Sequence, residues 1–315
     1  MKSLFNLIFS FSFILVFTGT FSKEQPNIIY IIADDLGYGD VSCLNPDKGK
    51  IPTPHIDTFA KQGMTFTNAH SSSSVCTPSR YGVLTGRYCW RTRLQEGAMK
   101  YGRPLIAEDR KTIASLLKED GYYTAGIGKW HLGSGYQIPA SNEIHYDEEP
   151  DALPIGTRMI SGPIEKGFDE YYWFKTFREG FTGHWTMIEN DIVDKNIPLD
   201  GMLPSLLHRG KEFITRMSTS NKPFFLYFAP PVPHNPIVPT PQWIGKNEIG
   251  SYGDFVMQLD NAIGQLMATL EKQGLAENTI VVITSDNGGA PSCMKLRKKG
   301  HYSSAHYRGF KSNVV

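Results

Sequence analysis

The sequence has few cysteines and no excess of charge of either sign. Its 315 residues include four cysteines, Cys43, Cys76, Cys89 and Cys293, too few for the dense disulfide frameworks that stabilise small secreted domains. No two of them are spaced like the ligand pairs of zinc sites. The 32 basic residues are balanced by 31 acidic ones, so no overall field favours binding to nucleic acid or to an anionic membrane.

A long apolar run is also absent outside the N-terminus. Lys2 is followed by a mostly apolar segment, Leu4–Phe17, and then by small residues up to Ser22. This order predicts a secretory signal peptide over residues 1–22. A membrane anchor is the alternative, but the run is shorter than the roughly 20 apolar residues that span a bilayer. We therefore expect no stable membrane span and a secreted or periplasmic protein, with residues 23–315 forming one domain.

Short β-branched or aromatic runs predict buried strands in four places. These are Asn27–Ala33, Tyr122–Ile127, Pro223–Ala229 and Thr279–Thr284. Amphipathic helices are expected before the last three strands, over Thr112–Glu119, Leu203–Met217 and Tyr252–Gln273. Helices that alternate with uniformly apolar strands predict an α/β fold, with a mostly parallel mixed sheet covered by helices on both faces.

Charged or metal-binding side chains follow each of these strands. They are Asp34 and Asp35, then Lys129 and His131, then His234, and finally Asp286 and Asn287. Ligands of open α/β sheets bind outside the carboxyl ends of the strands, so four such exits predict one shared site. The Asp and Asn side chains offer only oxygen ligands, which hard cations such as Ca²⁺ prefer. Taken alone, either pair would more simply cap a helix or a turn.

Between Gly133 and Pro198 the hydrophobic periodicity fades and aromatic residues gather. They are Tyr136, Tyr146, Tyr171, Tyr172, Trp173, Phe174, Phe177, Phe181 and Trp185. We expect an insertion whose rings either line a pocket or form a satellite core under a long loop.

The most specific motif is Cys76-Thr77-Pro78-Ser79-Arg80, followed by Leu84-Thr85-Gly86-Arg87. Pro78 suits the first turn of a helix, which predicts that Cys76 lies near a helix N-terminus, where partial positive charge favours an anion. A lone cysteine would more often be a buried thiol or half of a disulfide, but these neighbours favour a chemical role. If Cys76 is consumed, the other three cysteines allow at most one internal bridge.

With this motif the chain resembles the formylglycine-dependent sulfatases, arylsulfatase-like members of the alkaline phosphatase superfamily. Other matching segments follow in the family's order from Pro26 onwards: Gly128–Gly133, Gly162–Trp173, Pro231–Pro236 and Arg308–Lys311. The resemblance implies an alkaline-phosphatase-like catalytic domain. Sulfatases continue through a smaller C-terminal subdomain, so this chain is expected to be truncated at its C-terminal end.

The resemblance also implies a role for each residue of the site. Cys76 would be oxidised to formylglycine by a maturation enzyme; one hydroxyl of its hydrate would attack sulfur, and the second would release sulfate. One Ca²⁺ would be held by Asp34, Asp35, Asp286 and Asn287. Arg80 would steady the hydrate, Lys129 would contact both the hydrate and the sulfate, and His131 would be the base or hydrogen-bond partner of the second hydroxyl. His234 and Lys311 would bind sulfate, and His234 would help to protonate the leaving oxygen.

The implied activity is that of a sulfuric ester hydrolase acting on a sulfated saccharide or an aryl sulfate. The aromatic-rich segment favours a saccharide, because sugar rings pack well on aromatic faces. Two alternatives remain at this point. One is a phosphatase or phosphonate monoester hydrolase of the same superfamily, which would ordinarily use two zinc ions and further His or Asp ligands. The other is an inactive, truncated glycan-binding remnant.

Overall fold

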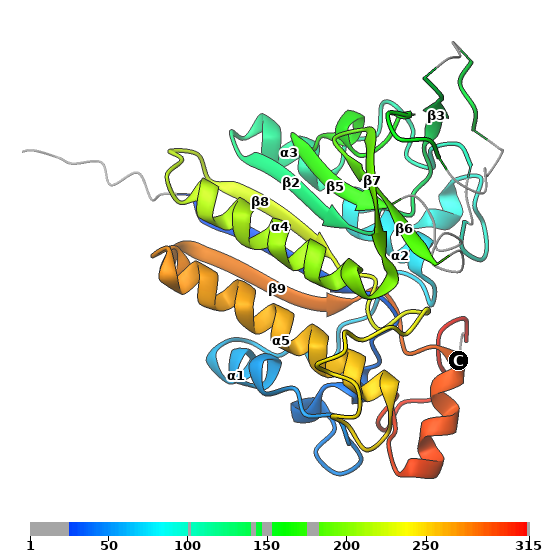
Figure 1. The fold of residues 1–315 in the computed structure, drawn as a ribbon, viewed down its shortest axis with the longest axis vertical. Helices are drawn as coiled ribbons and strands as arrows, with labels where there is room; N and C mark the ends of the chain where they lie inside the picture. The colour runs from blue at the N-terminus through cyan, green and yellow to red at the C-terminus, as the bar shows by residue number, and fades with distance from the viewer. Residues whose placement is uncertain (1–24, 100–101, 140–142, 147–152, 175–182, 314–315) are drawn as a thin grey trace, which may run out of the picture.

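The computed structural model describes residues 25–99, 102–139, 143–146, 153–174 and 183–313. Its centre is a nine-stranded sheet with the order β3-β4-β7-β6-β5-β2-β8-β1-β9 (Figure 1). The strands are β1 (Asn27–Ala33), β2 (Tyr123–Gly128), β3 (Gly135–Gln137), β4 (Arg158–Ile160), β5 (Glu170–Phe174), β6 (His184–Glu189), β7 (Ile192–Pro198), β8 (Phe224–Ala229) and β9 (Thr279–Ser285).

The sheet has a parallel half and an antiparallel half. Strands β5, β2, β8, β1 and β9 pair in parallel, and these include all four strands that the sequence predicts. Strands β3, β4, β7, β6 and β5 pair antiparallel, and they come from the segment in which periodicity predicts no strand. The predicted mixed α/β fold is confirmed.

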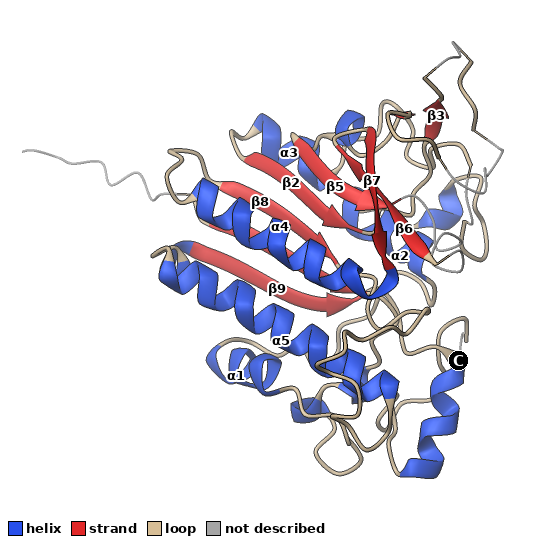
Figure 2. Cartoon of the chain, in the orientation of Figure 1, coloured by secondary structure: helices blue, strands red, loops and turns tan. Residues whose placement is uncertain are grey.

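Helices cover both faces of the sheet (Figure 2). The α-helices are α1 (Pro54–Gln62), α2 (Cys76–Thr85), α3 (Ile113–Glu119), α4 (Met202–Met217) and α5 (Ser251–Lys272). Helices α4 and α5 pack on one face, and α2 and α3 lie behind the sheet on the other. The three predicted helices agree with α3, α4 and α5 to within one residue at each end.

Two apolar cores explain this layered arrangement. Every residue of β8 is buried, as expected for a central parallel strand with helices on both sides. Leu226 and Phe228 join the core beneath α4 and α5, while Phe225 and Tyr227 join the core beneath α2 and α3. Side chains alternate between the faces of a strand, so one short apolar run supplies both cores.

The aromatic-rich segment proves to be core rather than pocket wall. Six of its rings are at most 5% exposed, those of Tyr136, Tyr171, Tyr172, Trp173, Phe174 and Trp185. Tyr146 is half-buried, and Phe177 and Phe181 lie outside the described residues. The rings pack in edge-on pairs, such as Phe174 with Trp185 at 5.1 Å between centroids, a favoured arrangement of aromatic side chains. The expectation that these rings line a pocket is therefore wrong for the six buried ones.

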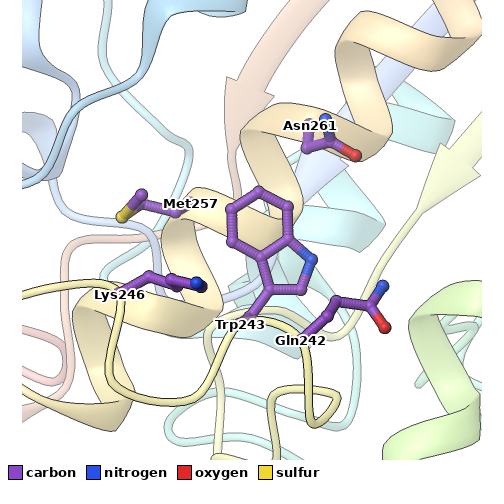
Figure 3. A pocket seen from close by; sticks show the side chains of 5 residues that line it. All are labelled: Gln242, Trp243, Lys246, Met257 and Asn261. Atoms are coloured by element: carbon purple, nitrogen blue, oxygen red, sulfur yellow. The ribbon is translucent and has the colours of Figure 1, made fainter.

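A hollow of about 340 Å³ lies beside α5. Its lining is Gln242, Trp243, Lys246, Met257 and Asn261 (Figure 3). None of the residues that follow the strands lines this hollow. Within the described part of the chain, no helix combines the length and apolarity needed to cross a bilayer.

We predict that Leu226→Ala lowers the free energy of unfolding by about 2–5 kcal/mol, because it leaves a cavity in the central strand. Leu226 is fully buried. The matched control is Leu116→Ala on α3, where the side chain is 52% exposed and the loss should stay within about 0.5 kcal/mol. Urea unfolding of both variants measures the difference, and equal losses would contradict the assigned core.

Candidate active site

The carboxyl ends of β1 and β9 bring two polar pairs together. Ala33 and Ser285 are paired neighbours in these strands, so Asp34 and Asp35 emerge beside Asp286 and Asn287. The Asp35 amide donates to Asp286 Oδ1 at 3.2 Å, and Asn287 Nδ2 donates to Asp35 Oδ1 at 2.7 Å. All four residues are at most 4% exposed, so this is an interior polar cluster.

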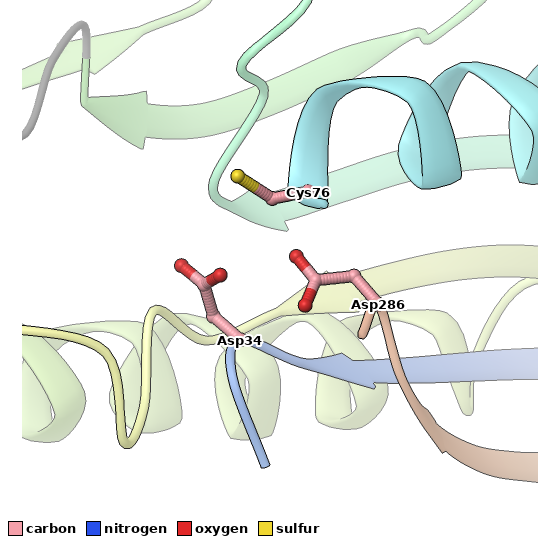
Figure 4. A group of neighbouring side chains, drawn as sticks. All are labelled: Asp34, Cys76 and Asp286. Carbon is pink, nitrogen blue, oxygen red and sulfur yellow. The ribbon is translucent and has the colours of Figure 1, made fainter. Parts of the chain in front are cut away.

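Cys76 lies over this cluster at the first residue of α2 (Figure 4). Its Sγ and carboxylate oxygens of Asp34 and Asp286 all lie within 4.8 Å of one another. The helix begins here because Val75 is extended and Pro78 needs no backbone partner in the first turn. The predicted position of Cys76 at a helix N-terminus is confirmed. All four cysteines are free thiols in the structure.

Two buried cations neutralise the acidic side chains. Arg80, one turn into α2, donates from Nε and Nη2 to Asp286 Oδ2 at 3.0 and 2.8 Å, and its Nη2 lies 3.7 Å from Asp34 Oδ1. Lys129 follows β2 and donates from Nζ to Asp34 Oδ2 at 2.7 Å. Both cations are at most 1% exposed. A buried charge without a partner costs several kcal/mol, so these pairs hold the two acids and α2 in place.

The remaining predicted residues close the same site from other elements. Lys311 Nζ lies 2.7 Å from Asp35 Oδ1. His234, from the loop after β8, places Nε2 3.7 Å from Asp35 Oδ2. His131 places Nε2 2.5 Å from the backbone oxygen of Met99, and the Lys129 charge is close enough to lower the pKa of its imidazole. The structure therefore brings all ten sequence-predicted residues together.

Three residues at or just after the strand ends have positive φ angles, and these conformations help to bring the site residues together. Asp35 and His131 have φ values of 63° and 58°, a left-handed region where strain often marks functional sites. Gly128 has φ of 111°, and a Cβ there would lie 2.1 Å from the oxygen of Ala229. Only glycine permits this approach, which lets the Lys129 amide donate to the same oxygen at 2.8 Å.

The pKa values of Asp34 and Asp286 are shifted in opposite directions. Burial works to raise the pKa of Asp34, but Lys129, His234 and Arg80 together hold that pKa well below its usual range. Burial and the nearby Asp34 raise the pKa of Asp286 to about 7. A cation bound between the two carboxylates would favour the ionised form of both.

The two histidines are both shifted toward the neutral form. Burial and the Lys129 charge lower the pKa of His131 well below its usual value. Burial also lowers the pKa of His234. His234 Nδ1 lies 2.7 Å from the backbone oxygen of Asn235, so Nδ1 carries the proton in that contact and Nε2 faces the acidic cluster.

Sequence reasoning missed one segment of the site, the loop around Met99. The Met99 amide donates to Thr77 Oγ1 at 3.1 Å, and its carbonyl contacts His131. These are backbone contacts of an apolar residue, so no side-chain chemistry indicates them. Thr77 is fully buried and was predicted only as part of the motif.

The oxygen atoms fit a hard divalent cation. Asp34 Oδ1 and Asn287 Oδ1 are buried without a hydrogen-bond partner among the described residues. Buried polar atoms are rarely left unpaired, and carboxylate and amide oxygens are the ligands of Ca²⁺. The side-chain nitrogen of Asn287 donates to Asp35 Oδ1 and to Gly288 O. Its Oδ1 therefore points away from these two acceptors.

A family model described as Sulfatase matches residues 26–311. The chain belongs to the sulfatase family. It is 35% identical over 336 aligned positions to the N-acetylgalactosamine-6-O-sulfatase of Bacteroides thetaiotaomicron, covering 92% of this chain and 65% of that one. It is 32% identical over 297 positions to human arylsulfatase A, covering 88% of this chain and 54% of that one. The resemblance inferred from the motifs is confirmed.

A solved sulfatase structure has the same fold. It is a Bacteroides thetaiotaomicron protein from work on the metabolism of multiple glycosaminoglycans, with a TM-score of 0.77 and 30% identity, covering 91% of this chain and 69% of that one. This chain spans between about half and two thirds of the length of the two curated sulfatases.

We predict that Ca²⁺ binds to this cluster and raises the thermal unfolding temperature. Asn287→Leu should abolish that rise, because it removes an unpaired ligand oxygen and leaves the carboxylates. The matched control is Asn278→Leu, an exposed position whose amide reaches only Gln25 O. Calorimetric Ca²⁺ titration and thermal unfolding with and without Ca²⁺ measure the effect. An unchanged affinity in Asn287→Leu would remove Asn287 from the ligand set.

Proposed function

We propose that this protein is a sulfuric ester hydrolase that releases sulfate from a sulfated saccharide and also accepts aryl sulfates. The observation that carries the proposal is the position of Cys76. It begins α2 in the family's maturation motif, its Sγ lies within 4.8 Å of carboxylate oxygens of two strand exits, and cationic groups surround it. Sulfuryl transfer builds negative charge near the nucleophile, which fixed cations stabilise.

An unmodified Cys76 is poorly suited to be the nucleophile. Burial raises the pKa of its thiol, which keeps the sulfur protonated, whereas reactive cysteines are thiolates. We propose that a maturation enzyme oxidises Cys76 to formylglycine. The hydrated aldehyde would supply a hydroxyl nucleophile together with a second hydroxyl that allows sulfate to leave.

One Ca²⁺ is proposed to bind Asp34, Asp35, Asp286 and Asn287. Bound there, it would polarise the nucleophile and neutralise charge on the sulfuryl oxygens. This proposal is supported by Asp34 Oδ1 and Asn287 Oδ1, which are buried and accept no hydrogen bond from the described residues.

The protein's own residues have distinct tasks in this scheme. Arg80 holds Asp286 and orients the first turn of α2. Lys129 and Lys311 bind sulfate oxygens, each from an ammonium group beside a carboxylate of the cluster. His131, neutral because its pKa is lowered, accepts the proton of the residue-76 side chain. His234 would donate a proton from Nε2 to the leaving oxygen when its ring carries a second proton, and its lowered pKa makes that imidazolium a stronger acid.

The saccharide preference is supported by similarity to a protein named N-acetylgalactosamine-6-O-sulfatase, while similarity to arylsulfatase A supports reaction with aryl sulfates. The predicted signal peptide, over residues 1–22, places the enzyme outside the cytoplasm in this proposal. A sulfated glycan met there would be the substrate.

We predict that protein produced with a formylglycine-generating enzyme carries an aldehyde at position 76, seen by peptide mass spectrometry as the thiol-to-aldehyde mass change. Cys76→Ser should then complete at most one sulfuryl transfer, since serine has no second hydroxyl with which to expel sulfate. The matched control is Cys89→Ser, also a buried cysteine, which should keep steady turnover. Multiple turnovers by Cys76→Ser would refute the assigned role.

A substrate panel tests the reaction class. Sulfated mono- and oligosaccharides, 4-nitrophenyl sulfate and the matching phosphate esters are assayed with the matured, Ca²⁺-loaded protein. We expect sulfate release from at least one saccharide, with aryl sulfate as a slower substrate. Phosphate esters that outpace all sulfates would replace the proposal by the phosphatase alternative. A matured protein that turns over none of the esters would indicate the inactive remnant.

A further inference from the structure

An exposed pair of aromatic rings lies immediately after α2. Tyr88 and Trp90 are 55% and 57% exposed, and their rings stack with centroids 6.2 Å apart and planes 18° apart. We call these two rings the aromatic platform. Large aromatic side chains are normally buried when they serve only stability, so two neighbouring rings left in solvent need another explanation.

The platform is held rigidly rather than loosely displayed. Cys89, between the two rings, is only 3% exposed, and it begins the short 3₁₀ helix Cys89–Arg91. Its carbonyl accepts from the Thr92 amide at 2.8 Å, and the Arg91 amide donates to Tyr88 O at 3.2 Å. The side chain of Cys89 thus points into the protein, while those of Tyr88 and Trp90 on either side of it are exposed. The buried cysteine and the backbone hydrogen bonds hold this turn in place.

Three arginines occur in the same segment as the platform, Arg87, Arg91 and Arg93. Arg91 lies over the Trp90 ring, with its guanidinium carbon 5.2 Å from the ring centroid. Arg87 and Arg93 flank the same turn, and no acidic residue occurs between Leu84 and Gln95. None of the three arginines forms a salt bridge within the described part of the chain. Guanidinium groups bind sulfate oxygens through paired hydrogen bonds.

The segment that carries the platform continues into the active site. Arg93 donates to the backbone oxygens of Arg103 and Pro104, which ties these two parts of the chain together. Within that loop, Met99 contacts Thr77 and His131. The platform and the wall of the active site are thus parts of one segment that begins at the end of α2.

We propose that the aromatic platform and its arginines form a second binding site that holds a further sugar unit of a sulfated oligosaccharide. This inference rests on the proposed function, because it extends the saccharide substrate beyond the residue at Cys76. The rings would pack against the sugar face, and Arg87 and Arg91 would bind its sulfate groups. The exposed rings alone would also suit single-stranded nucleic acid, but the shared segment with a sulfatase site favours a sulfated glycan.

The test compares Trp90→Ala with Trp90→Phe and with Trp243→Ala. Trp243 is the matched control, a partly exposed tryptophan in the hollow beside α5 (Figure 3). Calorimetry measures binding of a chondroitin 6-sulfate hexasaccharide and of its desulfated form to the full matured chain. Turnover of 4-methylumbelliferyl sulfate, which has no further sugar unit, is measured in parallel, and thermal unfolding checks that each variant is folded.

We expect Trp90→Ala to weaken hexasaccharide binding about tenfold, the effect of losing one aromatic contact of about 1.4 kcal/mol. Trp90→Phe should recover most of the affinity, and Trp243→Ala should match the unsubstituted protein. Arg91→Gln should remove most of the difference between the sulfated and desulfated hexasaccharides. Turnover of the aryl sulfate should stay unchanged in all four variants.

Equal hexasaccharide affinity in Trp90→Ala and the unsubstituted protein would overturn the inference, as would tighter Trp90-dependent binding of a dT10 oligonucleotide. The two proposals fail separately. If aryl sulfate is hydrolysed but no hexasaccharide binds, the second site is wrong and the sulfatase reaction stands. If no ester is hydrolysed but Trp90-dependent hexasaccharide binding persists, the proposed reaction is wrong and the second site stands.

Discussion

The balance of buried charge at the carboxyl edge of the sheet is the constraint on which the site depends. Asp34, Asp35 and Asp286 are three buried carboxyl groups, and each contacts a cation from a different part of the chain. Lys129 pairs with the first, Lys311 with the second and Arg80 with the third. Because an unpaired buried charge is very costly, the cluster forms only when all of these segments are in place together.

The fold supplies that convergence through the order of its strands. In the sheet, β1 lies between β8 and β9, and β2 lies next to β8, so four parallel strands end side by side. The helices on the two faces exclude water from the ends of the strands, and α2 adds its N-terminus above them (Figure 4). Partial positive charge at a helix N-terminus favours an anion at that position. Structural core and chemical site therefore share the same buried strands.

The parts of the fold predicted well from the sequence are those with a uniform local signal. The run Asn27–Ala33 is a strand with the predicted bounds. Helix α4 begins one residue earlier than predicted and ends as predicted, and α5 begins and ends one residue earlier than predicted. The sequence pattern does not predict strands β3 to β7, because their aromatic and polar residues alternate irregularly. Phe174 and Trp185 pack against each other from the neighbouring strands β5 and β6. Non-local packing of this kind overrides local pattern.

The sequence by itself determined the chemistry of this protein: which side chains are available, their place after apolar runs, and the motif around Cys76, since these depend on residue type and local spacing. Only the tertiary structure decided that His131 contacts the backbone of Met99, that Asp34 Oδ1 and Asn287 Oδ1 accept no hydrogen bond from the described residues, and that Tyr88 and Trp90 are exposed. Those properties depend on contacts and burial among segments that are far apart in the chain, and such contacts form only when the chain has folded.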